Sequence, residues 1–262
     1  SCAHRYLHSF PTRRSSDLVI CTPDVRLGPA IVEKAASHKL KVFSVDDRSI
    51  GSDGKPMTEV PYMGISAFEI GKMVGKALLD EYTKRGWKAE DTWALGVTLE
   101  ELDTAKQRTD GASEALAEGG FPKEHISIAA IRGLADVTNA FDAANVVLTQ
   151  HQKVKHWLVF GMNDESVLGG IRALEGRKLA ASDIIGVGIG GTTGRVDFEK
   201  PEATGFFSAV LISPKRHGYE TTEYLYKWIT EGIEPPRETL TTGLLIDRSN
   251  YRQIMQEQGV LD

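Results

Sequence analysis

Two polar residues, Asn163 and Asp164, stand at the end of an apolar run. Residues 157–162 are Trp-Leu-Val-Phe-Gly-Met, and a helical pattern starts at Glu165. The run predicts a buried parallel strand, and open α/β sheets bind ligands at the carboxyl ends of such strands. The Asn163 amide offers one acceptor and two donors, which suit the hydroxyls of a neutral, polyhydroxylated ligand. In the alternative interpretation Asp164 is the N-cap of the following helix, and only Asn163 is free to point at the ligand.

Thr104 and Arg108 lie four residues apart at the start of a predicted helix. Residues at this spacing share a helix face, so the Thr104 hydroxyl and the Arg108 guanidinium can reach one ligand. A guanidinium stays charged and donates several hydrogen bonds in one plane, which suits a ring oxygen and a hydroxyl together. The alternative is an Arg108 that pairs with Glu101 or Asp103 on a solvated surface.

Asp46 and Asp47 end another predicted strand, so we expect one of the two carboxylates to face an inter-lobe cleft. A glycoside hydrolase would need both carboxyls to flank one bond, about 5 to 9 Å apart. Adjacent residues of an extended chain point to opposite faces, which disfavours that pairing. Two solvated loop acids are an equally good interpretation of the local sequence.

Residues 186–191, Gly-Val-Gly-Ile-Gly-Gly, have the spacing of a dinucleotide-binding fingerprint. These glycines lie inside a predicted strand, and no acid ends the next strand, so we reject a nucleotide cofactor. They instead favour a close approach of the backbone to a ligand or a packed helix. We expect no catalytic residue and no metal site, and we interpret the remaining histidines as surface or satisfied core: His38, His125, His151, His156 and His217.

The composition predicts a two-lobed globular protein. The chain has 262 residues, 41% hydrophobic and 26% charged, with a net charge of -5. That length allows two domains with separate cores, and the acidic balance argues against a nucleic-acid partner. No apolar run is long enough to cross a bilayer. The two cysteines, Cys2 and Cys21, could form one disulfide; we favour a buried structural thiol at Cys21 over a reactive one.

Strand and helix patterns alternate from residue 19 onward, which predicts an α/β fold of parallel sheets. We expect the chain to cross between lobes near residues 63–67, 211–214 and 241–243. Residues 1–18 show neither the two-residue period of a strand nor the 3.6-residue period of a helix, and they resemble vector or adapter sequence. The expected strands are 19–21, 41–45, 92–97, 126–131, 157–160, 184–189, 204–211 and 240–246, and the expected helices are 27–38, 66–85, 104–118, 137–150, 165–174, 193–198, 214–231 and 250–258.

Seven short blocks carry a resemblance to a known family. The chain resembles the bacterial periplasmic L-arabinose-binding proteins, which are sugar-binding components of ABC importers, from Val19 nearly to the C-terminus. The blocks are Val-Ile-Cys-Thr-Pro-Asp (19–24), Val-Asp-Asp (45–47), Glu-Leu-Asp-Thr-Ala (101–105), Gly-Phe-Pro (120–122), Ala-Phe-Asp-Ala-Ala-Asn (140–145), Val-Lys-His-Trp-Leu (154–158) and Gly-Met-Asn-Asp (161–164).

The resemblance implies two Rossmann-like lobes of the periplasmic binding protein type I fold, closing by a hinge on one pyranose. Its implied partners are L-arabinose, with D-galactose and D-fucose also accepted, and an ABC permease in the inner membrane. The protein would be a periplasmic monomer without a cofactor. By motif, the ligand-binding residues would be Asp46, Asp47, Thr104, Arg108 and Asn163, with Cys21, Met162 and Gly190 nearby.

The resemblance also implies lobe boundaries and two departures from the family. The N-lobe would comprise residues 19–65 and 212–242, and the C-lobe residues 66–211 and 243–262. The N-lobe would be incomplete, because the family's first two strand-helix units have no counterpart and residues 1–18 stand in their place. Gly190 occupies the position of a second cleft asparagine.

Two other functions fit parts of the pattern. The sugar-sensing effector domain of a repressor-type transcription regulator shares this architecture, but it requires a basic helix-turn-helix, which residues 1–18 do not provide. A sugar-processing enzyme would need an acid and a base that the spacings do not supply. We therefore expect a binding protein whose ligand stabilises the closed lobes.

Overall fold

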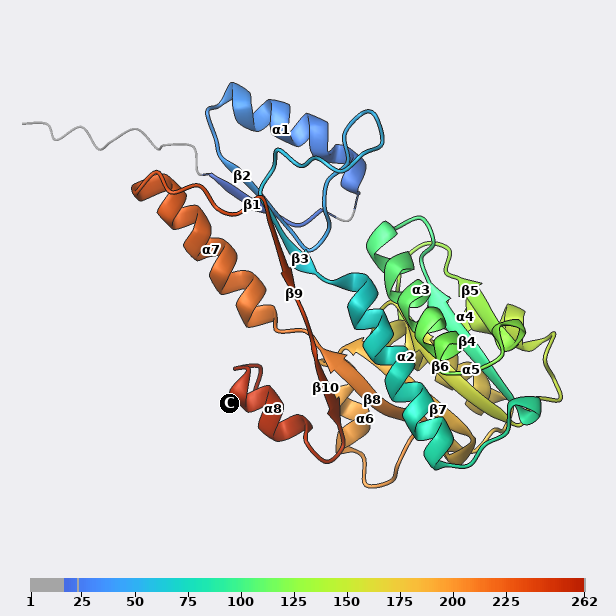
Figure 1. Ribbon diagram of the computed structural model, residues 1–262. Helices are drawn as coiled ribbons and strands as arrows, with labels where there is room; N and C mark the ends of the chain where they lie inside the picture. The colour runs from blue at the N-terminus through green and yellow to red at the C-terminus, as the bar shows by residue number, and fades with distance from the viewer. Residues whose placement is uncertain (1–16, 23, 262) are drawn as a thin grey trace, which may run out of the picture. The chain divides into compact units, whose positions relative to one another are not determined.

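The computed structural model describes residues 17–22 and 24–261 (Figure 1). The chain forms two compact units, each with its own sheet. The first unit comprises Ser1–Gly64 and Arg216–Thr239, and the second comprises Ile65–Lys215 and Leu240–Asp262. The α/β fold class predicted from the alternating pattern is confirmed. Within the described part of the chain, no helix is both long and apolar enough to span a membrane.

The first unit is built on a four-stranded sheet with the order β1-β2-β3-β9. β1 pairs with β2 and β2 with β3, both in parallel. Phe43 of β2 is fully buried and stacks on Tyr224 of α7, with ring centroids 6.1 Å apart. The elements are β1 (Leu18–Ile20), β2 (Val42–Val45), β3 (Tyr62–Ile65), β9 (Glu238–Thr241), α1 (Gly28–Ser37) and α7 (Pro214–Thr230).

The sheet of the first unit begins inside the segment predicted to be non-native. Residues 1–16 of that segment lie outside the described residues. Leu18 pairs with Val42, and the Asp17 carboxylate accepts a hydrogen bond of 2.6 Å from the Lys41 backbone N–H. Both residues are thus tied to the sheet.

The second unit contains a six-stranded sheet with the order β10-β8-β7-β6-β4-β5. β5, β4, β6, β7 and β8 pair in parallel, as predicted, and β10 adds one antiparallel strand at the edge beside β8. The strands are β4 (Thr92–Thr98), β5 (Ile126–Ala130), β6 (His156–Gly161), β7 (Ile184–Gly190), β8 (Phe206–Leu211) and β10 (Leu244–Asp247).

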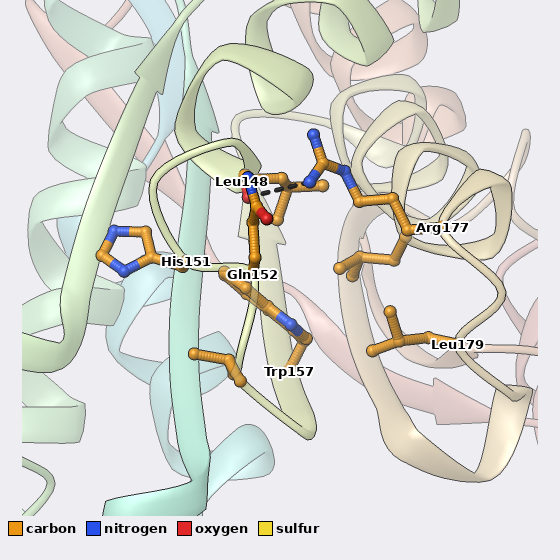
Figure 2. A pocket seen from close by; sticks show the side chains of 8 residues that line it. Leu148, His151, Gln152, Trp157, Arg177 and Leu179 are labelled. Atoms are coloured by element: carbon orange, nitrogen blue, oxygen red, sulfur yellow. Dashed lines mark hydrogen bonds between the residues drawn. The ribbon is translucent and has the colours of Figure 1, made fainter.

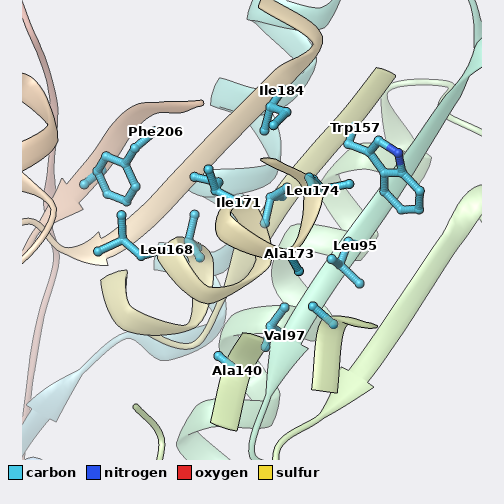
Figure 3. Close-up of a cluster of buried hydrophobic side chains, with 14 of the residues drawn as sticks. Leu95, Val97, Ala140, Trp157, Leu168, Ile171, Ala173, Leu174, Ile184 and Phe206 are labelled. Atoms are coloured by element: carbon cyan, nitrogen blue, oxygen red, sulfur yellow. The ribbon is translucent and has the colours of Figure 1, made fainter. Parts of the chain in front are cut away.

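Helices cover both faces of this sheet, which explains why β6 is apolar throughout. Trp157 and Val159 pack in one buried cluster with α4 and α5 (Figure 3), and Leu158 and Phe160 pack in the other with α2 and α3. A strand that is buried on both faces does not need to alternate apolar and polar residues. The helices are α2 (Ala67–Lys84), α3 (Asp103–Glu118), α4 (Val137–Leu148), α5 (Asp164–Gly176), α6 (Arg195–Glu199) and α8 (Tyr251–Glu257). Four short 3-10 turns complete the described elements: Val25–Leu27, Ala89–Asp91, Lys123–His125 and Ala181–Asp183.

The predicted strand 240–246 is two strands that belong to different sheets. β9 ends at Thr241, β10 begins at Leu244, and Gly243 lies between them. A Cβ at Gly243 would lie 2.2 Å from Val210 Cγ1, so the turn requires a glycine where the chain passes close to β8. The single-strand prediction was wrong at this point.

Candidate functional site

The segment after β6 contains Asn163, and the structure assigns the cap of the following helix to Asn163 rather than to Asp164. Asn163 is the N-cap of α5: its Oδ1 accepts hydrogen bonds from Ser166 N at 2.9 Å and Ser166 Oγ at 2.6 Å. Its Nδ2 donates to the Ala135 backbone oxygen at 3.3 Å. The prediction that Asp164 caps the helix was therefore wrong. With its oxygen used by the cap, the amide of Asn163 is best suited to donate its second N–H to a ligand.

Arg108 lies beside this segment. It is half-buried on α3, and its Nη1 donates a hydrogen bond to the Met162 backbone oxygen at 2.6 Å. The alternative interpretation of Arg108 as a solvated surface residue was therefore wrong. Met162 is buried, and Thr104 lies half-buried in the first turn of α3. Three of the predicted site residues, Arg108, Met162 and Asn163, therefore meet at the carboxyl end of β6.

Glycines bring α3 close enough to α2 to hold Arg108 in this place. A Cβ at Gly71 of α2 would lie 2.1 Å from the Arg108 backbone oxygen, and one at Gly111 of α3 would lie 2.2 Å from the Phe68 backbone oxygen. Real side chains could not fit at either position, so the two helix backbones touch. The backbone of Arg108 is thus packed directly on α2.

Gly190 ends β7 on the same edge of the second unit's sheet. Its φ of +117° lies in a region that L-residues rarely adopt. A Cβ at this position would lie 3.7 Å from Asp164 Oδ2. Gly190 is therefore next to α5. Gly186 and Gly188 lie inside β7, as predicted, whereas Gly190 is its last residue and Gly191 follows it.

Asp46 and Asp47 form a second group of site residues, in the first unit. Asp46 has a φ of +71°, so the pair is not extended and the argument that their side chains point to opposite faces does not apply. The Asp46 backbone N–H donates to Met63 O at 2.9 Å, and Ser44 Oγ donates to Asp47 O at 3.0 Å. These bonds fix the turn that presents both carboxylates.

Two residues that the sequence interpretation missed support Asp46. Tyr62 Oη donates to the Asp46 backbone oxygen at 2.7 Å, and His217 Nδ1 lies 3.5 Å from Asp46 Oδ1. Both side chains are buried, and burial, with the neighbouring carboxylates of Asp47 and then Asp46, raises the pKa of Tyr62. The sequence interpretation assigns His217 to surface or satisfied core. It is far from Asp46 in sequence, and no local pattern indicates the contact.

Cys21 lies near the two aspartates, and its predicted burial was wrong. The residue is exposed, with a free thiol, whereas Cys2 lies outside the described residues. Partial burial of the sulfur and then the carboxylates of Asp46 and Asp47 raise the thiol pKa. A raised pKa keeps the thiol protonated and poorly nucleophilic.

The site residues thus form two groups with complementary chemistry. The first unit presents the carboxylate acceptors of Asp46 and Asp47, and the second presents donors from Arg108 and Asn163. A hydroxyl both donates and accepts, so each group on its own could bind a hydroxyl of a polyol. Among residues 17–22 and 24–261, no cluster of three or more His, Cys, Asp or Glu side chains is arranged to hold a metal.

A separate hollow of about 190 Å³ lies at the opposite end of β6 (Figure 2). Trp157, near the start of β6, lines it together with Leu148 and Arg177. Arg177 Nη1 donates to the Leu148 backbone oxygen at 2.9 Å, and so satisfies a carbonyl at the C-terminus of α4. The arginine has a structural role here, away from the carboxyl ends of the strands.

Comparison with known proteins identifies a family and two relatives that this chain resembles. Residues 1–253 match the family of periplasmic binding proteins and the sugar binding domain of the LacI family. The L-arabinose-binding periplasmic protein of Escherichia coli K12 is 43% identical over 97% of this chain and 77% of its own length. The ABC transporter L-arabinose-binding periplasmic protein of Azospirillum brasilense is 45% identical over 92% of this chain and 72% of its own.

A solved structure shows the same fold. The ABC transporter periplasmic solute binding protein of Actinobacillus succinogenes 130z, with bound D-allose, superposes with a TM-score of 0.71 at 18% identity. The match covers 90% of this chain and 79% of that one. The predicted periplasmic binding protein type I fold is thereby confirmed.

Proposed function

Because the chain belongs to the family of periplasmic binding proteins and LacI-type sugar-binding domains, we propose that it binds L-arabinose and delivers it to an ABC importer. The observation that carries this proposal is the 43–45% identity to two proteins named for L-arabinose, over at least 92% of this chain. The complementary donors and acceptors described above suit such a neutral polyol. D-galactose and D-fucose are further candidate ligands.

We assign the ligand contacts to five residues. Arg108 and Asn163 donate hydrogen bonds to the sugar, and Asp46, Asp47 and Thr104 provide acceptors and a hydroxyl. The half-burial of Arg108 supports this assignment, because a partly desolvated guanidinium makes stronger hydrogen bonds than a solvated one. The contacts of Arg108 with Met162 and of Asn163 with Ala135 fix the orientation of the two side chains.

The sugar leaves the site unchanged in this proposal, so the protein is not an enzyme. Its partner is an ABC permease, its compartment is the periplasm and it acts as a monomer without a nucleic-acid partner. A sugar-sensing domain of a transcription regulator is the second candidate, because the family description includes such domains. The two relatives named for periplasmic transport favour the first.

The test is a calorimetric titration of L-arabinose into Arg108→Ala. Loss of a charged, half-buried donor should weaken binding by about 1.5 to 3 kcal/mol, or roughly tenfold to a hundredfold. Arg172→Ala removes an exposed arginine from α5 in the same unit and serves as the control, with an unchanged dissociation constant expected. Equal affinities for Arg108→Ala and the parent chain would remove Arg108 from the site.

A further inference from the structure

Asp164 is a buried carboxylate that the proposed ligand contacts do not use. It is the first residue of α5 and only 2% exposed. Gly188 of β7 makes room for it, because a Cβ at that position would lie 2.4 Å from Asp164 Oδ1. A charged group buried in this way requires hydrogen-bond donors around it.

The donors come from the loop between β7 and α6. Gly194 N donates to Asp164 Oδ2 at 2.9 Å, and the backbone N–H groups of Gly191 and Thr193 also interact with the carboxylate. The neighbouring Glu165 accepts a hydrogen bond of 2.7 Å from Thr193 Oγ1. The first turn of α5 therefore holds residues 191–194 by both of its acidic side chains.

We propose that Asp164 is a positioning residue of the sugar site, which holds the loop after Gly190 at a fixed place beside Asn163. The inference rests on the proposed function. Asn163 is the residue before Asp164, and Gly190 is the residue before the loop, so one carboxylate ties together two segments at the ligand end of the sheet. The ionised carboxylate is a stronger acceptor for the Gly194 N–H than the neutral acid, because a charge-assisted hydrogen bond is stronger than a neutral one.

The charge state of Asp164 provides a readout that packing alone would not give. Burial raises its pKa to about 6, the Glu165 carboxylate adds to the rise, and the N–H groups of Gly194, Gly191 and Thr193 oppose it. Its neighbours on β7 and β8, Gly188 and Phe206, are uncharged. Within the described residues, Glu165 is the charged side chain that acts on it. Acidification from pH 8 to pH 5 should therefore protonate Asp164 and weaken its hold on the loop.

The experiment measures the L-arabinose dissociation constant at pH 8, 7, 6 and 5. The parent chain should bind severalfold, and at most about tenfold, more weakly at pH 5 than at pH 8, because only about a tenth of the carboxylate stays ionised one unit below the pKa. Asp164→Asn should bind weakly at pH 8 and show no such pH dependence. Asp197→Asn is the matched control: Asp197 is a nearby buried aspartate of α6 that pairs with Lys200, and its loss should preserve the parent pH profile.

A second measurement needs neither a variant nor a sugar. In NMR spectra of the sugar-free parent chain, the Gly194 amide signal should titrate with a midpoint near pH 6. A parent affinity that is constant from pH 8 to pH 5, or a Gly194 amide that does not titrate, would overturn the proposal. If the parent chain binds no arabinose at any pH, the proposed function fails, and the role of Asp164 in sugar binding fails with it. The amide titration then decides separately whether Asp164 holds the loop.

Discussion

Asn163 combines a structural and a proposed ligand-binding role in one side chain. Its oxygen caps α5, and its nitrogen donates to Ala135 and, in our proposal, to the sugar. Asp caps a helix as well as Asn does but lacks the donor, whereas Ala provides neither group. Substitutions at this position can therefore separate the two roles.

We expect Asn163→Asp and Asn163→Ala to weaken L-arabinose binding by about tenfold or more, because both remove the donor. Asn163→Ala should also lower the free energy of unfolding by about 1 kcal/mol through loss of the cap, and Asn163→Asp should lower it less. Asp136→Ala is the control. The Asp136 carboxylate caps α4 by accepting a hydrogen bond from Asn139 N, so its loss should lower the free energy of unfolding by a similar amount without changing the affinity for L-arabinose. Calorimetry and chemical denaturation give the two quantities, and parent-like affinity in Asn163→Asp would exclude the ligand role.

The sequence indicated that Asn163 and Asp164 follow the carboxyl end of a strand, but not what each side chain does there. Asn and Asp are equally good caps, so adjacent Asn163 and Asp164 left the helix start ambiguous, and tertiary contacts of Asp164 with the loop around Gly194 decided it. His217 supports Asp46 from 171 positions further along the chain. Contacts of this kind depend on the fold, and no local pattern encodes them.

At the scale of elements, the contact of α2 with α3 positions Arg108. Gly71 allows the two backbones to meet at the Arg108 carbonyl, so any side chain there must push α3 away.

Gly71→Ala should lower the free energy of unfolding by about 1 to 3 kcal/mol, as overpacking does, and should weaken L-arabinose binding because Arg108 moves. Gly176→Ala is the control: Gly176 ends α5, and no atom lies within 4 Å of the place that a Cβ would take, so this change should raise stability by about 0.5 to 1 kcal/mol. Thermal unfolding and calorimetry measure both effects. A Gly71→Ala protein as stable as Gly176→Ala would contradict the proposed packing of the helices.

Elements with a strong pattern were predictable, and elements without one were not. β6 is recognisable because a strand buried on both faces is a continuous apolar run. β3 was missed because the strand has only four residues, contains Gly64 and is not separated from β2 by a helix. β9 and β10 were merged because residues 240–246 form one β-type run, and only their pairing with different sheets separates them.

At the scale of the whole molecule, the chain passes between its two units three times, after Gly64, Lys215 and Thr239. Each unit has its own sheet and presents its own group of polar residues at strand ends. The net charge of -5 suits a neutral ligand better than a polyanion. These properties fit a receptor that holds a sugar by hydrogen bonds.

The most direct test of this account is a calorimetric titration of the whole chain with L-arabinose, followed by NMR of the recovered sugar. We expect saturable binding of one sugar per chain and an unaltered NMR spectrum of the sugar. The absence of saturable heat up to about 1 mM L-arabinose, which corresponds to a binding free energy weaker than about -4 kcal/mol, would contradict the account. Chemical conversion of the sugar would contradict it as well.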